Sequence, residues 1–339
     1  MERRGWTVLI GTVLVAVLTA VSLVVNVPYV ALGPGPTINT LGTMHGKKII
    51  TVLDGHASSS RGQLRLVTVS VIDNLTLWEA LWDWHDDRYA VVPRDVVYPP
   101  GQSDQETDKQ QEQQFQDSQS SAETAAYREL GCPVKVTVRS LVKSSPARGH
   151  LKPGDVIDTV DGSRVTSTQR LVDLVQAKKA GTKRTIGYQR GAEKGTTAIT
   201  TKASGDGGGA VIGISVGQKQ PCQYKVKVDL GEIGGPSAGM MFALGIVDTL
   251  TSTDLTGGRV IAGTGEITAD GKVVPIGGIQ EKMIGARDYG ATVFLTPKDN
   301  CAQAVGSVPD GLRLVRVDTL HDAIGALADL RAHRPTPTC

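Results

Sequence analysis

The sequence has almost no excess charge of either sign and no cysteines at metal-binding spacing. Its 36 lysines and arginines against 34 aspartates and glutamates leave a formal net charge of +2, without the basic excess of a nucleic-acid-binding surface. The cysteines at positions 132, 222, 301 and 339 form no C-x-x-C pair, so no zinc site is expected. These absences argue against nucleic acid as a partner, and no metal or other cofactor is expected.

A phosphate-binding loop is also missing. Lys272 follows a glycine, but the spacing from Gly265 to Gly271 is one residue too long for G-x-x-x-x-G-K-[ST], and neither Ser nor Thr follows the lysine. The chain therefore has no ATPase module, and its activity is expected to be independent of ATP.

A long apolar run without a charged residue occupies residues 6–27. About 20 apolar residues span a bilayer as a helix, and Arg3 and Arg4 before the run place the N-terminus in the cytoplasm by the positive-inside rule. Residues 1–28 are thus expected to be a cytoplasmic stub and an uncleaved membrane anchor, with the body outside. The alternative is a cleaved signal peptide, although its small-x-small site at residues 20–22 would lie inside the apolar run.

An extracytoplasmic body allows disulfides, and four cysteines permit three full pairings. Cys222 and Cys301 flank the segment that carries the chemistry described below, so they are the preferred pair. Cys339 is the last residue and is expected to be free.

Residues 29–131 are expected to form an N-terminal extracytoplasmic segment of strands and turns. A stiff exit loop is predicted at residues 33–36, and strands are predicted at residues 48–53 and 63–72.

Two helices are predicted in the same segment. Residues 75–84 are rich in Trp and Leu and predict a helix that either lies near the membrane surface or packs in the core. Gln, Ser, Asp and Glu dominate residues 101–123, so a mobile loop is expected there, followed by a helix at residues 122–130.

Residues 132–204 predict a compact unit of alternating strands. PGDVI at residues 153–157 and VDG at residues 160–162 alternate turn and strand residues, and an amphipathic stretch follows at residues 167–179. These motifs resemble a PDZ domain. The resemblance implies a β-sandwich-like fold in which a peptide adds as a strand in a groove beside a helix. The nearest candidate for the carboxylate-binding loop is residues 131–134; alternatively, the PDZ domain only positions or gates the next domain.

Residues 205–330 predict an α/β domain that follows a glycine-rich linker at residues 204–209 and ends in a tail at residues 331–339. The expected elements are strands at residues 224–230, 260–263, 273–275 and 293–296, and helices at residues 237–250, 279–289 and 320–330.

The motif GPSAG at residues 235–239 places Ser237 on a glycine-flanked turn between a strand and a helix. A serine hydroxyl needs a base to take its proton, and no histidine lies near it in the sequence. Amides at a helix N-terminus face developing negative charge, so those of Ser237 and Ala238 are candidates for an oxyanion hole.

The candidate base is Lys282. On a helix it shares a face with Ile279 and Ala286, an apolar setting that lowers a lysine pKa toward the range of a useful base, while Glu281 and Arg287 can point to solvent.

GPSAG also satisfies G-x-S-x-G, the nucleophile elbow of α/β-hydrolases. That esterase alternative would need a later acid and histidine, for which Asp299 and His321 are the candidates. No HGGG-type oxyanion loop precedes Ser237, and the PDZ-like segment occupies the place where the hydrolase sheet would begin.

Several motifs in order resemble the proteolytic domain of Lon proteases: GGPSAG, TGEIT at residues 264–268, GKVVPIGG at residues 271–278, and Glu281-Lys282. The resemblance implies an α/β (α+β) Lon-type fold with Ser237 as nucleophile, Lys282 as general base and Thr264 as an active-site hydrogen-bonding partner. The sequence departs from the pattern at Gly235, where Lon enzymes often have Asp.

A second departure lies in the strand before the serine, which has Lys225 and Lys227 in place of the Lon histidines. The resemblance also extends backward, because residues 62–66 and 118–131 are similar to the opening strand and helix of the Lon fold. It implies that the PDZ domain is inserted into a discontinuous catalytic domain.

Taken together, the chain resembles the Lon-like (S16-type) Ser-Lys proteases that carry a PDZ domain and a membrane anchor. The resemblance implies an ATP-independent endopeptidase that acts on unfolded or exposed proteins outside the membrane, in a homo-oligomeric ring of six. The alternative is a membrane-tethered PDZ adaptor whose protease domain is inactive.

Overall fold

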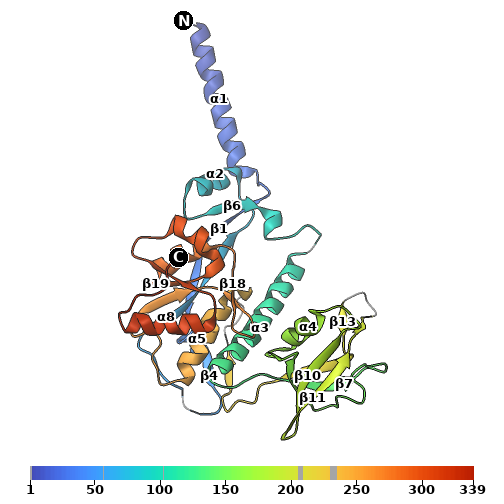
Figure 1. The fold of residues 1–339 in the computed structure, drawn as a ribbon. Coiled ribbons are helices and arrows are strands. Elements are labelled where there is room, and N and C mark those ends of the chain that lie inside the picture. The colour runs from blue at the N-terminus through green and yellow to red at the C-terminus, as the bar shows by residue number, and fades with distance from the viewer. Residues whose placement is uncertain (1, 56, 102, 205–208, 230–234) are drawn as a thin grey trace.

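The computed structural model describes residues 2–55, 57–101, 103–204, 209–229 and 235–339. An isolated helix, α1 (Glu2–Val24), projects from the body (Figure 1). Within the described residues it is the one helix long and apolar enough to cross a membrane, over Gly5–Val24, with a mean hydropathy of 2.5. The expected N-terminal apolar helix is therefore present.

A six-stranded mixed sheet forms the centre of the body. Its order is β20 (Arg313–Val317), β19 (Val293–Pro297), β16 (Val260–Gly263), β5 (Gln63–Ile72), β1 (Tyr29–Asn39) and β6 (Ala90–Pro93). The strands β20, β19, β16 and β5 run parallel, whereas β1 is antiparallel to both β5 and β6. Segments from the two ends of the chain thus share one sheet, and the chain between them builds a second one.

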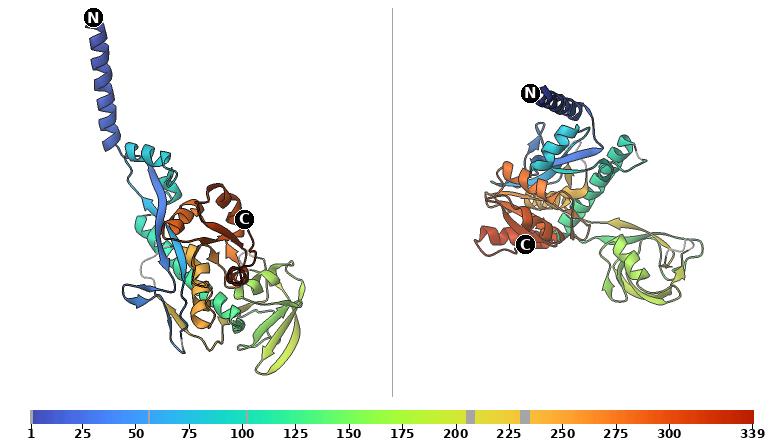
Figure 2. Two further views of the ribbon diagram at one scale, coloured as in Figure 1. Left: turned by 90° about the vertical axis from the view of Figure 1, so that its left-hand side faces the viewer. Right: turned by 90° about the horizontal axis from the view of Figure 1, so that it is seen from above.

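Helices cover both faces of this sheet (Figure 2). The helices α5 (Gly239–Leu250) and α8 (Leu320–Arg331) pack on one face, with α3 (Asp104–Glu129) against α5, and α6 (Ile279–Asp288) packs on the other. Because side chains alternate along a strand, Ile261 lies in the first of these cores and Ala262 in the second.

The long helix α3 replaces the mobile loop expected at residues 101–123. Its start has a capping box, in which Ser103 and Glu106 each accept from the other's backbone N–H. Gln, Glu and Ala favour helix, and Phe115, Ala122 and Ala126 are buried at helical spacing against α5. The prediction was wrong because it weighed the low apolar content and overlooked the cap and the spacing.

The exit loop expected at residues 33–36 is also wrong, because this segment lies within β1. A β-carbon on Gly33 would lie 2.6 Å from the Tyr89 ring, and one on Gly35 would lie 2.4 Å from Thr68 Oγ1. The glycines therefore allow close packing inside the sheet. An irregularity in the β1–β5 register between Pro34 and Thr37 accommodates the prolines.

The second sheet has the order β11 (Glu193–Thr200), β10 (Lys183–Arg190), β8 (Val156–Val160), β7 (Lys135–Leu141) and β14 (Ile214–Lys219), with β9 (Ser163–Arg164) beside β8. With α4 (Thr168–Gln176) it encloses a separate core that includes Ile157, Leu171 and Ile186. The expected limit at residue 204 cuts this sheet, since β14 lies beyond it. The expected linker at 204–209 joins β12 (Lys202–Ala203) to β13 (Ala210–Val211), and its residues 205–208 lie outside the described residues.

Disulfides join Cys132 to Cys222 and Cys301 to Cys339, so the expected Cys222–Cys301 pair and the free Cys339 are both wrong. The position of Cys222 and Cys301 on either side of the serine segment did not predict which cysteines pair. Cys132 follows α3 and Cys222 follows β14, so their bond joins the two segments through which the chain enters and leaves the second sheet. The other bond ties the C-terminal tail to α7 (Cys301–Ala304).

Short elements complete the fold. They are the strand pairs β2 (Thr43–Met44) with β3 (Lys47–Lys48), β4 (Ile50–Val52) with β15 (Val226–Val228), and β17 (Glu266–Ile267) with β18 (Val273–Val274); the helix α2 (Leu77–His85); and the 3-10 turns η1 (Arg94–Val96), η2 (Pro236–Ala238), η3 (Lys298–Asn300) and η4 (Val305–Ser307).

Candidate active site

Ser237 is half-buried in the 3-10 turn η2, immediately before α5. Its carbonyl oxygen accepts hydrogen bonds from Gly265 N at 2.8 Å and from Thr264 Oγ1 at 3.1 Å. These bonds fix the serine turn against the carboxyl end of β16, the edge where α/β sheets place their functional groups.

Two glycines shape this turn. Gly235 has φ +89°, a conformation that favours glycine over the Asp that Lon enzymes often carry there. Gly239 lets the helix start approach its neighbours, since a β-carbon there would lie 2.6 Å from Ser118 Oγ. The preceding residues 230–234, including Gly234 of the sequence motif, lie outside the described residues.

Lys282 lies in the first turn of α6 and is only 5% exposed. Its Nζ donates to the carbonyl of Gly277 at 3.0 Å. Burial lowers the pKa of Lys282 to about 8, against the opposing effect of the negative charge of Glu281. A lysine with this pKa is neutral in about one molecule in ten at pH 7 and in about half of them at pH 8, so the neutral amine that a general base requires is available.

The surroundings of Lys282 agree only in part with expectation. Ile279 and Ala286 are fully buried, as the helix spacing predicted. Glu281 was expected to point to solvent but is 6% exposed, and Arg287 is half-buried with Nε donating to Asp310 O. The reason is that α6 packs on β1 and β5 of the sheet and also contacts α7, so more of its surface is covered than its spacing predicted.

Ser237 and Lys282 lie on elements that are connected through β17 and β18. Gly265, bonded to the Ser237 carbonyl, leads into β17, which pairs with β18, and β18 leads on through Gly277 to α6. Among the described residues, however, no hydrogen bond joins Ser237 Oγ to Lys282 Nζ. The lysine instead bonds the Gly277 carbonyl.

Thr264 is fully buried, and its hydroxyl bonds the backbone of Ser237 rather than the Ser237 or Lys282 side chain. It therefore holds the turn in place. Lys225, one of the lysines that replace the Lon histidines, forms an ion pair with Asp54 at 2.9 Å.

The esterase triad is not assembled in the described structure. His321 is exposed on α8 and its Nδ1 lies 3.1 Å from Glu129 Oε2 on α3. Asp299 is exposed in η3.

A groove of about 370 Å³ lies in the second sheet between α4 and β14. Its walls are apolar, with Leu171, Val172 and Val175 from α4 and Ile214 and Val216 from β14. Within the described residues β14 has one strand neighbour, β7, so its other edge is open to an added strand.

The turn at the end of this groove is Val211-Ile212-Gly213-Ile214, where Gly213 has φ +73°. Ser145 Oγ holds it by donating to the Ile212 carbonyl. The expectation that residues 131–134 form the carboxylate-binding loop is wrong, because Gly131 and Cys132 terminate α3 with backbone bonds to Arg128 and Tyr127.

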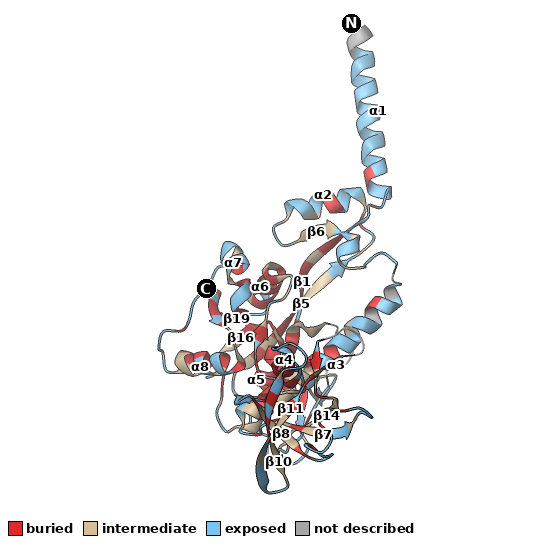
Figure 3. Ribbon diagram, turned by 45° about the vertical axis from the view of Figure 1, so that its right-hand side comes forward, coloured by how far each residue is buried: buried red, intermediate tan, exposed pale blue. Residues whose placement is uncertain are grey.

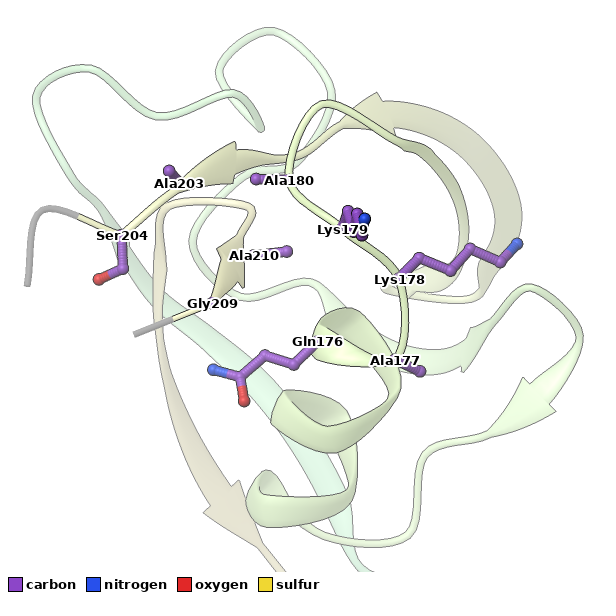
Figure 4. A pocket seen from close by; sticks show the side chains of 9 residues that line it. All are labelled: Gln176, Ala177, Lys178, Lys179, Ala180, Ala203, Ser204, Gly209 and Ala210. Carbon is purple, nitrogen blue, oxygen red and sulfur yellow. The ribbon is translucent and has the colours of Figure 1, made fainter. Parts of the chain in front are cut away.

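A second pocket of about 450 Å³ adjoins the groove beyond the C-terminal end of α4 (Figure 4). It shares Gln176, Ser204 and Ala210 with the groove.

Comparison with known families assigns both parts of the body. Residues 222–327 match the model of the Lon protease (S16) C-terminal proteolytic domain, and residues 108–201 match that of the PDZ domain. Residues 222–327 form a Lon-type proteolytic domain. The PDZ match begins within α3 and ends before β14, the strand that completes the PDZ sheet here.

The curated relatives agree with the assignment of the proteolytic domain. Lon protease 1 of Bacillus subtilis is 42% identical over 79 residues, which are 23% of this chain and 10% of the relative. Lon protease 1 of Sorangium cellulosum is 35% identical over 130 residues, 37% of this chain and 16% of the relative. The chain thus spans between a tenth and a sixth of the length of these relatives.

Among solved structures, the PDZ domain of an SdrC-like protein from Listeria monocytogenes is 32% identical. The match covers 24% of this chain and 85% of that one, with a TM-score of 0.23.

The first part of helix α3, before the predicted helix at residues 122–130, was missed by the sequence analysis, as were the contacts of α3 with the serine turn. Ser118 Oγ donates to the Pro236 carbonyl at 2.8 Å, and the Gln111 carbonyl accepts from Gly235 N at 3.4 Å. Support for the serine turn therefore comes from a segment on the other side of the PDZ domain in the sequence. The capping box at Ser103 and Glu106 was the available signal for this helix.

Proposed function

We propose that the chain is a membrane-anchored, ATP-independent serine endopeptidase with a Ser237–Lys282 dyad. The observation that carries the proposal is a deeply buried Lys282 with a pKa of about 8 in a domain of the S16 protease family. Burial makes the charged form of a lysine unfavourable and so favours the neutral amine. Groups with such a perturbed pKa are concentrated at functional sites, where a neutral amine can act as a general base.

In the proposed reaction, neutral Lys282 Nζ takes the proton of Ser237 Oγ as that oxygen attacks the scissile carbonyl carbon. The amides of Ser237 and Ala238 stabilise the oxyanion, with Thr264 and Gly235 holding the turn. The lysine then gives the proton to the leaving amine, and water hydrolyses the acyl-enzyme by the same route. Before this, Nζ exchanges its bond to Gly277 O for one to Ser237 Oγ, a tightening typical of the substrate complex.

The proposed location is the outer face of a membrane, with α1 as an uncleaved single-pass anchor and the N-terminus in the cytoplasm. The apolar span and the preceding Arg3 and Arg4 support this orientation. The two disulfides also support it, because such bonds persist in oxidising compartments.

We propose that the catalytic domain is discontinuous, with residues 29–131 and the segment after β14 contributing to one fold around the inserted PDZ domain. The shared central sheet supports this division. The PDZ domain recruits or gates substrate chains, and the proteolytic domains assemble as a homo-oligomer, six protomers by resemblance to Lon.

Cleavage of an unfolded protein in the absence of nucleotide tests this function. The full-length protein in detergent is expected to degrade a reduced, unfolded substrate at equal rates with and without ATP, while the same substrate in its folded form resists. Substrate binding without turnover under all conditions would favour the membrane-tethered PDZ adaptor instead.

Substitution in the PDZ groove is expected to weaken peptide capture. Val172 is an exposed wall residue, and Val172→Glu places a charge where the apolar side chain of a bound peptide would lie. Because desolvation of an unpaired charge is unfavourable, binding of peptides with a free carboxylate and an apolar last residue should fall by at least about tenfold. Fluorescence anisotropy measures this, with Thr168→Glu, which adds a charge to the first turn of α4 outside the groove, as the matched control. Equal affinity in both variants would show that peptides bind elsewhere.

A further inference from the structure

The tryptophans are distributed unusually in this chain. The sequence has four tryptophans: Trp6 lies at the start of the apolar span, and Trp78, Trp82 and Trp84 lie on α2. They are 66%, 48%, 65% and 76% exposed, respectively. Large aromatic side chains are rarely left in water without reason, and Trp is enriched at both interfaces of a bilayer.

The helix α2 has its apolar side chains on the outside. Leu77, Trp78, Leu81 and Trp82 lie at positions i, i+1, i+4 and i+5 and therefore form one continuous face, on which the two indoles stack with centroids 6.4 Å apart. Leu77 is 37% and Leu81 50% exposed, so this face is uncovered along its length (Figure 3).

The opposite side of α2 attaches it to the body. Ala80 is buried in a small cluster with Ala31 and Leu75, onto which Tyr89 and Val91 pack. A small residue faces the protein and the large ones face away, the reverse of a helix that packs in a soluble core. Glu79 is engaged in the capping box with Thr76 and so lies off the apolar face.

The chain holds α2 at the end of the span. Val27 N donates to Leu75 O at 2.9 Å, and Leu77 N donates to Val25 O at 3.0 Å, so the first residues after α1 are hydrogen-bonded to the start of α2 (Figure 1). The headgroup region adds roughly 5–8 Å on each side of the hydrocarbon core, and a helix is about 10 Å across. A helix fixed at the exit of the span therefore lies within the interface.

Other exposed apolar residues lie at the same end of the body. Tyr29 begins β1, and Ile72 ends β5 opposite Ala31; they are 42% and 40% exposed, and Val96 in the η1 turn after β6 is 67% exposed. In Figures 1 and 2 the PDZ domain lies at the opposite end, away from α1.

We propose that α2 is an interfacial membrane helix. Its Leu77, Trp78, Leu81, Trp82 and Trp84 side chains enter the outer headgroup and upper acyl region of the lipid bilayer, so the catalytic body is attached to the membrane at two points. A single span leaves a body free to rotate and tilt, whereas a second contact fixes its orientation. The PDZ groove is thereby held away from the lipid. This inference rests on the proposed membrane anchoring through α1.

Tryptophan fluorescence in vesicles of brominated lipid tests the attachment through α1 and the attachment through α2 separately. The full-length Trp6→Phe variant, reconstituted in phosphatidylcholine vesicles, emits only from α2. Lipids with bromine near the headgroup end of the acyl chain are expected to quench this emission to about half or less, and lipids with bromine near the chain end to quench it less. Aqueous iodide should quench it weakly.

The Trp78→Phe/Trp82→Phe/Trp84→Phe variant emits only from Trp6 and reports on the span. If Trp6 is quenched by the lipid and the α2 tryptophans are not, the interfacial helix is refuted while the anchor stands. If neither is quenched, the anchoring itself fails. Protection of α2 from both iodide and brominated lipid would mean that another protein surface, such as a second copy, covers this face, which also refutes the proposal.

Discussion

Replacement of Ser237 by alanine is expected to abolish peptide hydrolysis. Loss of a serine nucleophile that acts as a unit with its base lowers kcat by roughly 10³–10⁶-fold, because only oxyanion stabilisation and substrate positioning remain. Ser237 is half-buried, and the contacts that hold its turn run through its backbone, so alanine should leave the fold intact. Initial rates on an unfolded protein, with circular dichroism of each variant, measure the two effects.

The matched control is Ser252→Ala, which removes an exposed hydroxyl shortly after α5. It should retain the activity of the parent protein. Persistent hydrolysis by a purified Ser237→Ala preparation, at a rate unaffected by further purification, would exclude Ser237 as the nucleophile.

Replacement of Lys282 by methionine is expected to remove activity and at the same time raise stability. The pKa of Lys282 is lowered by burial from 10.5 to about 8, so below about pH 8 the folded protein holds a buried charge that the unfolded chain exposes to water. Methionine fills similar space without that charge. At pH 7 the free energy of unfolding should therefore rise by about 1–3 kcal/mol, less the loss of the bond to Gly277 O.

The stability contributed by Lys282 also depends on pH, and the direction of this dependence follows from the lowered pKa. Between the folded pKa of about 8 and the unfolded pKa of 10.5, the unfolded chain binds more protons, so the stability contributed by this group increases with pH through that window. The Lys282→Met variant should lack this increase. Denaturant titrations of both proteins from pH 7 to above 10 measure it.

The pH dependence of the catalytic rate should report the ionisation of the same lysine. Since the base must be neutral, kcat/KM is expected to rise about tenfold per pH unit below pH 8 and to level off above it. Lys48→Met, which removes an exposed lysine from β3, is the control and should change neither the rate nor its pH profile. A Lys282→Met variant that retains activity would exclude the proposed dyad, and one that unfolds more readily at pH 7 would contradict the buried-charge account.

The central elements of the proteolytic domain were predictable from local patterns. Apolar runs bounded by glycines located β16, β19, α5, α6 and α8 within a few residues, because each buries a regular face and ends at a turn residue. The buried setting of Lys282 also followed from its spacing to Ile279 and Ala286.

The pairing of the cysteines and the full length of α3 were not found in this way. The pairing of Cys132 with Cys222 depends on where the chain leaves and re-enters the body, which no local pattern contains. Helix α3 has few apolar residues, and what stabilises it, beyond its cap, is the surface of α5.

The sequence alone determined the candidate nucleophile and base, which are a serine on a glycine-flanked turn and a lysine in an apolar helix. It also showed an apolar span preceded by arginines and no phosphate-binding loop. These depend on residue type and short spacing, which the chain carries locally. The resemblance to Lon implied that the PDZ domain is inserted, but only the tertiary structure gave the strand order of the shared sheet. It alone also decided that Ser118 supports the serine turn and that the α2 tryptophans face outward beside the span. Such features arise from contacts between distant segments, and their free energy exists only once the chain is folded.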